Sequence, residues 1–97
     1  MPATHNKEWS LYIVRCKDNS LYTGISNDVD ERFSTHQAQG PKCAKYLRGR
    51  APLELVFVSV IGSMSEASKL EWEIKQYSKE EKEVLIARGE PAVPTST

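Results

Sequence analysis

The sequence is poor in cysteine and has no long apolar run. Its two cysteines, Cys16 and Cys43, have neither C-x-x-C spacing nor paired histidines nearby, so neither a disulfide framework nor a structural zinc site is expected. The longest apolar stretch, residues 55–61, is much too short to span a bilayer. Because the first nine residues lack the apolar segment of a signal peptide, we expect a cytoplasmic protein with no membrane partner.

An excess of charge of one sign is also absent. The 13 lysines and arginines balance 13 acidic residues, which disfavours a protein that coats nucleic acid nonspecifically. The cations are unevenly placed, because residues 32–53 contain five of them and no acidic residue. This basic segment suits a focused anionic ligand, and a solvated loop is the plainer alternative. Its cations are Arg32, Lys42, Lys45, Arg48 and Arg50.

A chain of 97 residues has room for one domain with one modest core. Residues 9–16 and 21–25 are apolar, aromatic and β-branched, and they flank a polar turn, which predicts a β-hairpin. Residues 53–61 predict a third strand in the same way. We place the domain at residues 9–88, with flexible ends at residues 1–8 and 89–97.

Three helices are predicted from one repeated signature, a capping side chain three residues before a glutamate. Gly40 and Gly89, each with a proline within the next two residues, should end the first and last helix. The order β-β-α-β-α-α predicts an α+β fold with a small three-stranded antiparallel sheet flanked by helices. The predicted helices span about residues 28–39, 64–77 and 79–88.

Polar side chains fall on the expected apolar faces of two helices. At 100° per residue, Arg32 and His36 share an arc with Val29 and Phe33, and their i, i+4 spacing brings them to one patch. Glu71 lies on the apolar stripe of the second helix. A histidine at the core margin, a snorkelling arginine and an Arg32–Glu71 ion pair would explain these positions without any function. The functional alternative is a Mg²⁺ site in which Glu71 acts with water and a substrate phosphate.

These residues, with Tyr12 and Tyr22, are sufficient for one type of chemistry. Phosphodiester hydrolysis needs a base for the attacking water, a cation for the pentavalent phosphate and a metal for the leaving oxygen. Tyrosine with an ordinary pKa of about 10 is a poor base. The two tyrosines can serve one site only if they share a face of the hairpin, which requires an odd loop or a bulge.

The ordered residues resemble a known family. Ser10-Leu11-Tyr12, Tyr22-Thr23-Gly24, Arg32, His36 and Glu71 together resemble the GIY-YIG nuclease superfamily, and residues 9 to about 87 resemble its short stand-alone bacterial members. The stretch ASKLEWEIK is also similar to the corresponding helix of Slx-type structure-specific endonucleases. Ser10 and Thr23 depart from the residues that give the family its name. An asparagine that some relatives carry after the glutamate helix has no clear counterpart here.

The resemblance implies a metal-dependent DNA endonuclease that acts on branched, nicked or single-stranded forms. Glu71 would hold a single Mg²⁺ or Mn²⁺, and Arg32 would bind the scissile phosphate. Tyr12, in preference to Tyr22, would activate water, and Gly24 would let the backbone pass close to the site. The implied site therefore joins Tyr12, Tyr22, Gly24, Arg32, His36 and Glu71, with both tyrosines on one face.

The basic segment is expected to border this site. Lys42, Lys45 and Arg48 should contact backbone phosphates, and Tyr46 is available to stack on an unpaired base. Two alternatives stay open, a nucleic-acid-binding module without useful turnover and a protein-interaction module. A protein partner is compatible with either, and the sequence does not set the oligomeric state.

Overall fold

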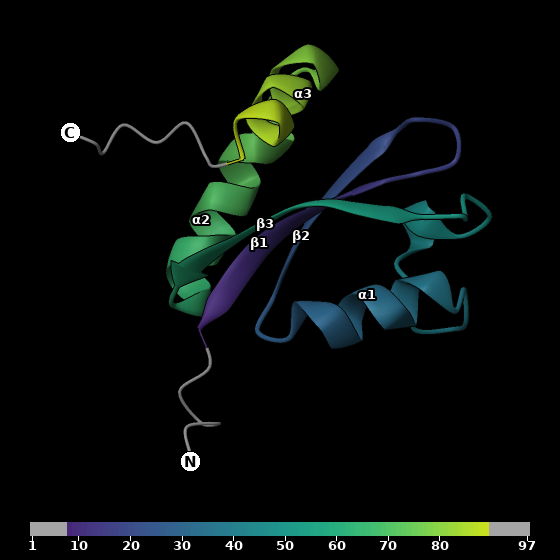
Figure 1. Cartoon of the computed structure of the whole chain (residues 1–97). Coiled ribbons are helices and arrows are strands. Elements are labelled where there is room, and N and C mark those ends of the chain that lie inside the picture. The colour runs from purple at the N-terminus through teal and green to yellow at the C-terminus, as the bar shows by residue number, and fades with distance from the viewer. Residues whose placement is uncertain (1–7, 90–97) are drawn as a thin grey trace.

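The computed structural model describes residues 8–89, which form a three-stranded antiparallel sheet with helices packed on both of its faces (Figure 1). The predicted order β-β-α-β-α-α is confirmed, with one unpredicted 3₁₀ turn before the third strand. Apart from residues 8 and 89, the expected flexible ends lie outside the described residues. The elements are β1 (Trp9–Arg15), β2 (Leu21–Ser26), α1 (Val29–Gln37), η2 (Lys45–Leu47), β3 (Glu54–Gly62), α2 (Met64–Lys75) and α3 (Lys79–Arg88).

The β1–β2 hairpin places the two tyrosines on one face of the sheet. Tyr12 lies opposite Gly24, and Val14 lies opposite Tyr22. Residues that are directly opposite in an antiparallel pair point to the same face. Tyr12 and Tyr22 therefore share a face, and their ring centroids are 6.4 Å apart.

An odd loop produces this register, as the spacing of the tyrosines requires. The Cys16 N–H donates to the Ser20 carbonyl at 2.9 Å, which leaves the three residues 17–19 as the loop. Asn19, the last of them, has a left-handed φ of 71°, as is common in three-residue hairpin loops.

β1 is the central strand, with β2 and β3 on its two edges. The β1–β3 pairing shifts register twice, between Trp9 and Ser10 and between Ile13 and Val14. Each shift leaves one extra residue in β3, which is the pattern of a β-bulge.

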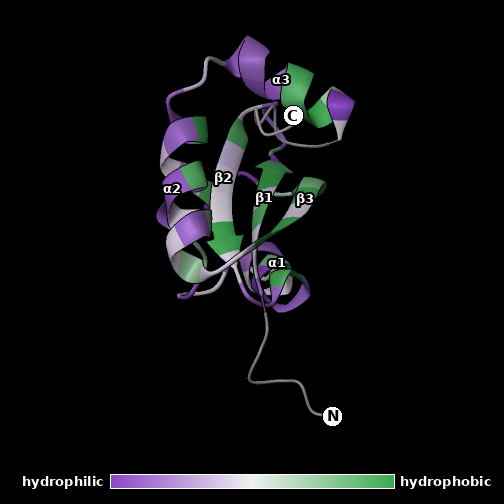
Figure 2. Cartoon of the chain, turned by 90° about the vertical axis from the view of Figure 1, so that its left-hand side faces the viewer, coloured by the Kyte–Doolittle hydropathy of each residue, from purple (hydrophilic) through white to green (hydrophobic). Residues whose placement is uncertain are grey.

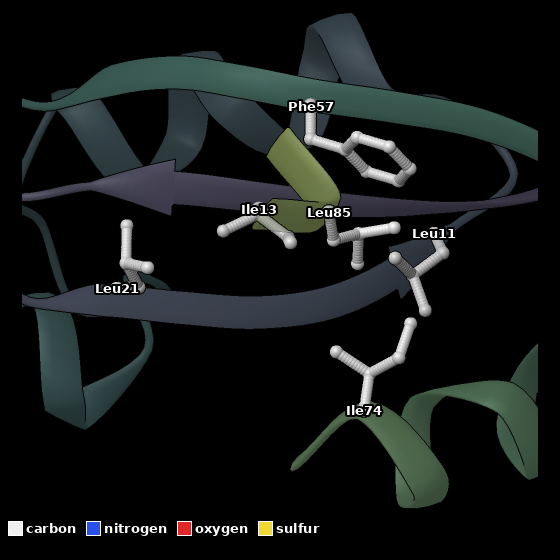
Figure 3. Close-up of a cluster of buried hydrophobic side chains, with 6 residues drawn as sticks. All are labelled: Leu11, Ile13, Leu21, Phe57, Ile74 and Leu85. Carbon is white, nitrogen blue, oxygen red and sulfur yellow. The ribbon is translucent and has the colours of Figure 1, made fainter. Parts of the chain in front are cut away.

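One apolar core lies between the sheet and the two C-terminal helices. Leu11 and Ile13 of β1 pack with Ile74 of α2 and Leu85 of α3 (Figure 3). Figure 2 shows α2 running alongside β2 with hydrophobic residues turned toward the sheet. Because odd-numbered β1 residues fill this core, the even-numbered ones, Tyr12 among them, face the other side.

A second apolar cluster covers the tyrosine face. Tyr12 and Val14 of β1 are buried there with Leu47 of η2, and Val29 and Phe33 of α1 pack against them. The 3₁₀ turn, which the sequence pattern did not predict, therefore supplies a core residue to the face that carries both tyrosines.

Hydrogen-bonded caps begin the last two helices as predicted. Ser63 with Glu66 and Ser78 with Glu81 form complete, reciprocal capping boxes. Gly89 ends α3 in the left-handed conformation, with φ 81°. Within residues 8–89, no helix is both long and apolar enough to cross a membrane.

The end of α1 differs from the prediction. The helix ends at Gln37, and the left-handed residue that follows is Gln39, with φ 57°, rather than Gly40. The Gln39 side-chain amide donates to the His36 carbonyl at 3.0 Å and to the Leu47 carbonyl at 3.1 Å. These bonds fix the basic segment to the end of α1, which compensates for the uncommon backbone conformation.

Gly24 lies directly against the side chain of Tyr12, its partner across the hairpin. A Cβ atom at this position would lie 2.5 Å from the Tyr12 hydroxyl oxygen and 2.6 Å from the ring carbon that bears it. The Tyr12 ring therefore lies directly over the Gly24 backbone. A side chain at position 24 would therefore crowd the site, as expected, and the group that it would displace is the Tyr12 phenol.

Gly24→Ala should displace the Tyr12 ring and destabilise the fold by about 1–3 kcal/mol, which is the usual cost of overpacking a buried site. For a domain of this size, the melting temperature should fall by roughly 4–8 °C per kcal/mol. Gly40→Ala is the matched control, because its added Cβ would meet nothing within 4 Å. A Gly24→Ala protein that melts with wild type would contradict the close approach.

Candidate active site

The central polar contact on the tyrosine face joins Tyr12 of β1 and His36 of α1. The Tyr12 hydroxyl oxygen and the His36 Nε2 are 3.0 Å apart. Tyr12 is 1% exposed and His36 is fully buried. A buried polar pair of this kind is worth most when both partners are satisfied, and removing one partner leaves the other unpaired.

The second nitrogen of His36 sets the tautomer. The backbone N–H of Ala44 donates to Nδ1 at 3.4 Å, so Nδ1 carries the lone pair. In the neutral ring the proton is then on Nε2, which donates to the Tyr12 oxygen. Burial, followed by the charge of Arg32, lowers the pKa of His36 to about 4, so the ring is neutral at pH 7.

Opposing effects act on the Tyr12 phenol. Burial is the largest, and with the nearby Tyr22 it raises the Tyr12 pKa to about 12. The charge and a hydrogen bond of Arg32 act in the opposite direction, and the charge of Glu71 adds a small upward effect to the same pKa. Tyr12 is therefore a neutral phenol at pH 7, with the His36 Nε2 at 3.0 Å from its oxygen and the charge of Arg32 nearby.

Arg32 projects from the first turns of α1 toward the basic segment. Its Nη1 donates to the Lys42 carbonyl at 3.2 Å, and its side chain is half-buried. Because its charge acts on the pKa of both Tyr12 and His36, Arg32 lies close to both, as their shared arc predicts.

Glu71 belongs to α2, which packs on the sheet face opposite Tyr12, and its charge acts on the Tyr12 pKa. Its side chain is 23% exposed, so it lies at the margin of the stripe that buries Ala67 and Ile74. Its salt bridge is with Lys75, at 3.2 Å, one helical turn further along the same helix. Within the described residues no Arg32–Glu71 ion pair forms, so that explanation of the two inward charges is wrong.

Tyr22 adds an aromatic column to the site. Its ring lies edge-on to His36, with centroids 5.8 Å apart, and stacks on Tyr46 at 5.9 Å and 24°. The Arg50 guanidinium lies 4.4 Å from the centroid of Tyr46. The structure thus brings Tyr46 to the border of the site, with both a ring and a guanidinium already against it.

The rest of the basic segment lies around this column. Arg48 donates to the Pro41 carbonyl at 2.8 Å, and Arg50 to the Tyr46 carbonyl at 2.6 Å. Lys45 is exposed at the start of η2, next to Tyr46. The fold therefore gathers the basic segment beside the tyrosines through its own backbone contacts.

Three residues that support the candidate site were not identified from the sequence. The backbone N–H of Ala44 fixes the His36 tautomer, and no sequence pattern signals such a contact. Gln39 joins α1 to η2, and a glutamine has no characteristic spacing that would reveal this role. Lys75 could have been found, because its i, i+4 spacing from Glu71 is the usual helical ion-pair signal.

The donors that could hold a divalent cation are few. Within residues 8–89, no group of three or more histidine, cysteine, aspartate and glutamate side chains could enclose a metal. Both His36 nitrogens are engaged, by Tyr12 and by Ala44, which leaves the Glu71 carboxylate. One carboxylate fits Mg²⁺, which keeps several waters and takes further ligands from substrate phosphate.

Comparison with known proteins identifies related chains. The GIY-YIG catalytic domain matches residues 8–83. A UPF0213 protein of Cronobacter sakazakii is 53% identical over 81 residues, which are 84% of this chain and 83% of that protein. The UPF0213 protein YhbQ of Escherichia coli K12 is 47% identical over 81 residues, 84% of this chain and 79% of that one.

A solved structure shares the fold. The solution NMR structure of the UPF0213 protein BH0048 from Bacillus halodurans has 40% sequence identity and a TM-score of 0.54, over 93% of this chain and 98% of that one. The family match covers all three strands and all six residues of the Tyr12 site. The chain therefore belongs to the GIY-YIG family of nuclease catalytic domains, and to its small bacterial UPF0213 members.

Proposed function

We propose that the protein is a divalent-metal-dependent endonuclease that hydrolyses phosphodiester bonds in DNA, in branched, nicked or single-stranded forms. The observation that carries this proposal is the Tyr12–His36 pair, a phenol held at 3.0 Å by a neutral, fully buried imidazole. Its Arg32 neighbour is a suitable cation for a scissile phosphate, and Glu71 is a suitable ligand for a metal.

Tyr12 is the proton acceptor in this mechanism. The His36 Nε2–H donates to its oxygen at 3.0 Å, and the Arg32 guanidinium is near enough for its charge to lower the Tyr12 pKa; both stabilise the negative charge of a phenolate. Burial works against ionisation and keeps the pKa of Tyr12 at about 12. Deprotonated Tyr12 is consequently a strong base but scarce at neutral pH, so the rate should rise with pH.

Arg32 binds and orients the phosphate. Its guanidinium is half-buried, anchored by the Lys42 carbonyl, and has further N–H donors for phosphate oxygens. Glu71 would hold the Mg²⁺ or Mn²⁺ ion, which when bound stabilises charge on the leaving oxygen. Lys75 now occupies one oxygen of Glu71, so a bound ion would share or displace that salt bridge.

One observation favours the alternative, a nucleic-acid-binding module without turnover. The Glu71 carboxylate already has a cationic partner in Lys75, so its position beside the core is explained without a metal. In the endonuclease the Glu71 charge is needed for cleavage, whereas in the binding module it serves only the salt bridge with Lys75 within α2.

Glu71→Gln decides between them. Because the Glu71–Lys75 pair is a partly exposed i, i+4 salt bridge, its loss should change the free energy of unfolding by less than about 1 kcal/mol. If Glu71 is the metal ligand, Mg²⁺-dependent or Mn²⁺-dependent cleavage should fall by at least about 100-fold. Cleavage is measured on labelled single-stranded, flapped and duplex DNA, with EDTA as the blank.

Glu73→Gln is the matched control, since Glu73 is exposed on the same helix. It should cleave like wild type. A Glu71→Gln protein that is stable and cleaves as fast as Glu73→Gln would contradict the endonuclease mechanism and favour the binding module.

The neutral state of His36 predicts a pH-dependent stability. The pKa is about 4 in the folded protein and 6.5 in an ordinary histidine, so the folded state holds fewer protons between these values. The His36 contribution is complete above pH 6.5 and is lost as the pH falls toward 4, at up to about 1.4 kcal/mol per pH unit.

This contribution is measured by urea unfolding of wild type and His36→Gln at several pH values, followed by tryptophan fluorescence. The stability difference between the two proteins should shrink steadily from pH 7 to pH 4.5. Parallel curves over that range would show that His36 is not held neutral, and the assigned donor role toward Tyr12 would be lost with it.

A further inference from the structure

A cavity lies at the open edge of β2, next to the Tyr12 site. It has a volume of about 380 Å³ and is lined by residues from β2, η2, α2 and α3. Because β2 is an outer strand, no neighbouring strand covers this edge within the described fold. The lining residues are Leu21, Tyr22, Thr23, Tyr46, Lys75 and Lys82.

Two lysines give the cavity a positive charge. Lys82 is half-buried, and burial together with the charge of Lys75 lowers its pKa. Within residues 8–89, Lys82 forms no salt bridge, and no carboxylate lines the cavity. The two lysines repel each other, and the half-buried Lys82 has no carboxylate partner within the described residues. A bound anion would reduce both the repulsion and the cost of burying the Lys82 charge.

We propose that this cavity, with Lys75 and Lys82 at its wall, is a subsite for a phosphate that flanks the scissile bond in the strand being cut. The proposal rests on the nuclease function argued above. Lys75 places the subsite close to the catalytic residues, because its ammonium bonds Glu71 at 3.2 Å and lies 5.9 Å from the Tyr22 ring centroid. The Tyr22–Tyr46 stack then forms an aromatic wall against the sugar and base of the same nucleotide.

The site is tested by Lys82→Gln, which removes the charge and keeps most of the side chain. Binding is measured by fluorescence anisotropy with a labelled 12-nucleotide single strand in EDTA, at several salt concentrations. Lys82→Gln should weaken binding by about tenfold, and the slope of log K against log salt should become shallower by about 0.7. Lys69→Gln, with the same charge change at an exposed position on α2, should match wild type in both measurements.

Failure of the subsite and failure of the nuclease function give different results. If wild type cleaves DNA with metal but Lys82→Gln binds DNA like Lys69→Gln, the subsite is wrong and the nuclease stands. If wild type never cleaves but Lys82→Gln loses binding, the subsite stands on a protein that only binds. A titration with inorganic phosphate, followed by the amide NMR signal of Thr23, completes the test. Saturation at micromolar phosphate would assign the cavity to free phosphate and overturn the strand assignment.

Discussion

The passage of the Tyr12 ring over the Gly24 backbone is the constraint on which the site depends. It allows a large aromatic side chain on the central strand to extend across the outer strand without colliding with it. The Tyr12 hydroxyl can then meet His36 from α1 and come within electrostatic reach of Glu71 from α2, which lies on the opposite face of the sheet. A side chain at this position would collide with the Tyr12 ring, so the glycine allows the Tyr12 hydroxyl to reach His36.

Burial has opposite consequences on the two faces of the sheet. Between the sheet and α2 and α3, the core is apolar and its burial stabilises the fold directly. On the tyrosine face a phenol and an imidazole are buried with the aliphatic residues, and a cation lies at their edge. Burial there raises the pKa of Tyr12 and lowers that of His36, so both groups are neutral at pH 7. Burying these polar groups lowers the stability of the fold, which is common at functional sites.

Sequence patterns predicted the elements and most of the site, and the reasons are specific. Strand alternation and capping signatures are local, so they located β1 to β3 and the starts of all three helices. The shared face of the tyrosines was predicted as a condition that an odd loop or a bulge would meet, and the three-residue loop meets it. The partner of Glu71 was missed because helical angles place a carboxylate near the core without saying which cation it meets, and Lys75 rather than Arg32 meets it. Gln39 and the Ala44 N–H act through contacts with other segments, which no local pattern encodes.

The central claim is that Tyr12, held by neutral His36, accepts the proton of the attacking water. The most direct test is the pH dependence of single-turnover DNA cleavage by wild type, Tyr12→Phe and Tyr22→Phe between pH 7 and 10. With a Tyr12 pKa of about 12, the wild-type rate should rise by about tenfold per pH unit. Tyr22→Phe should keep that slope, and Tyr12→Phe should lose it and be slower by about 10²–10⁴-fold. A Tyr12→Phe protein that retains the wild-type rate and slope would contradict the account.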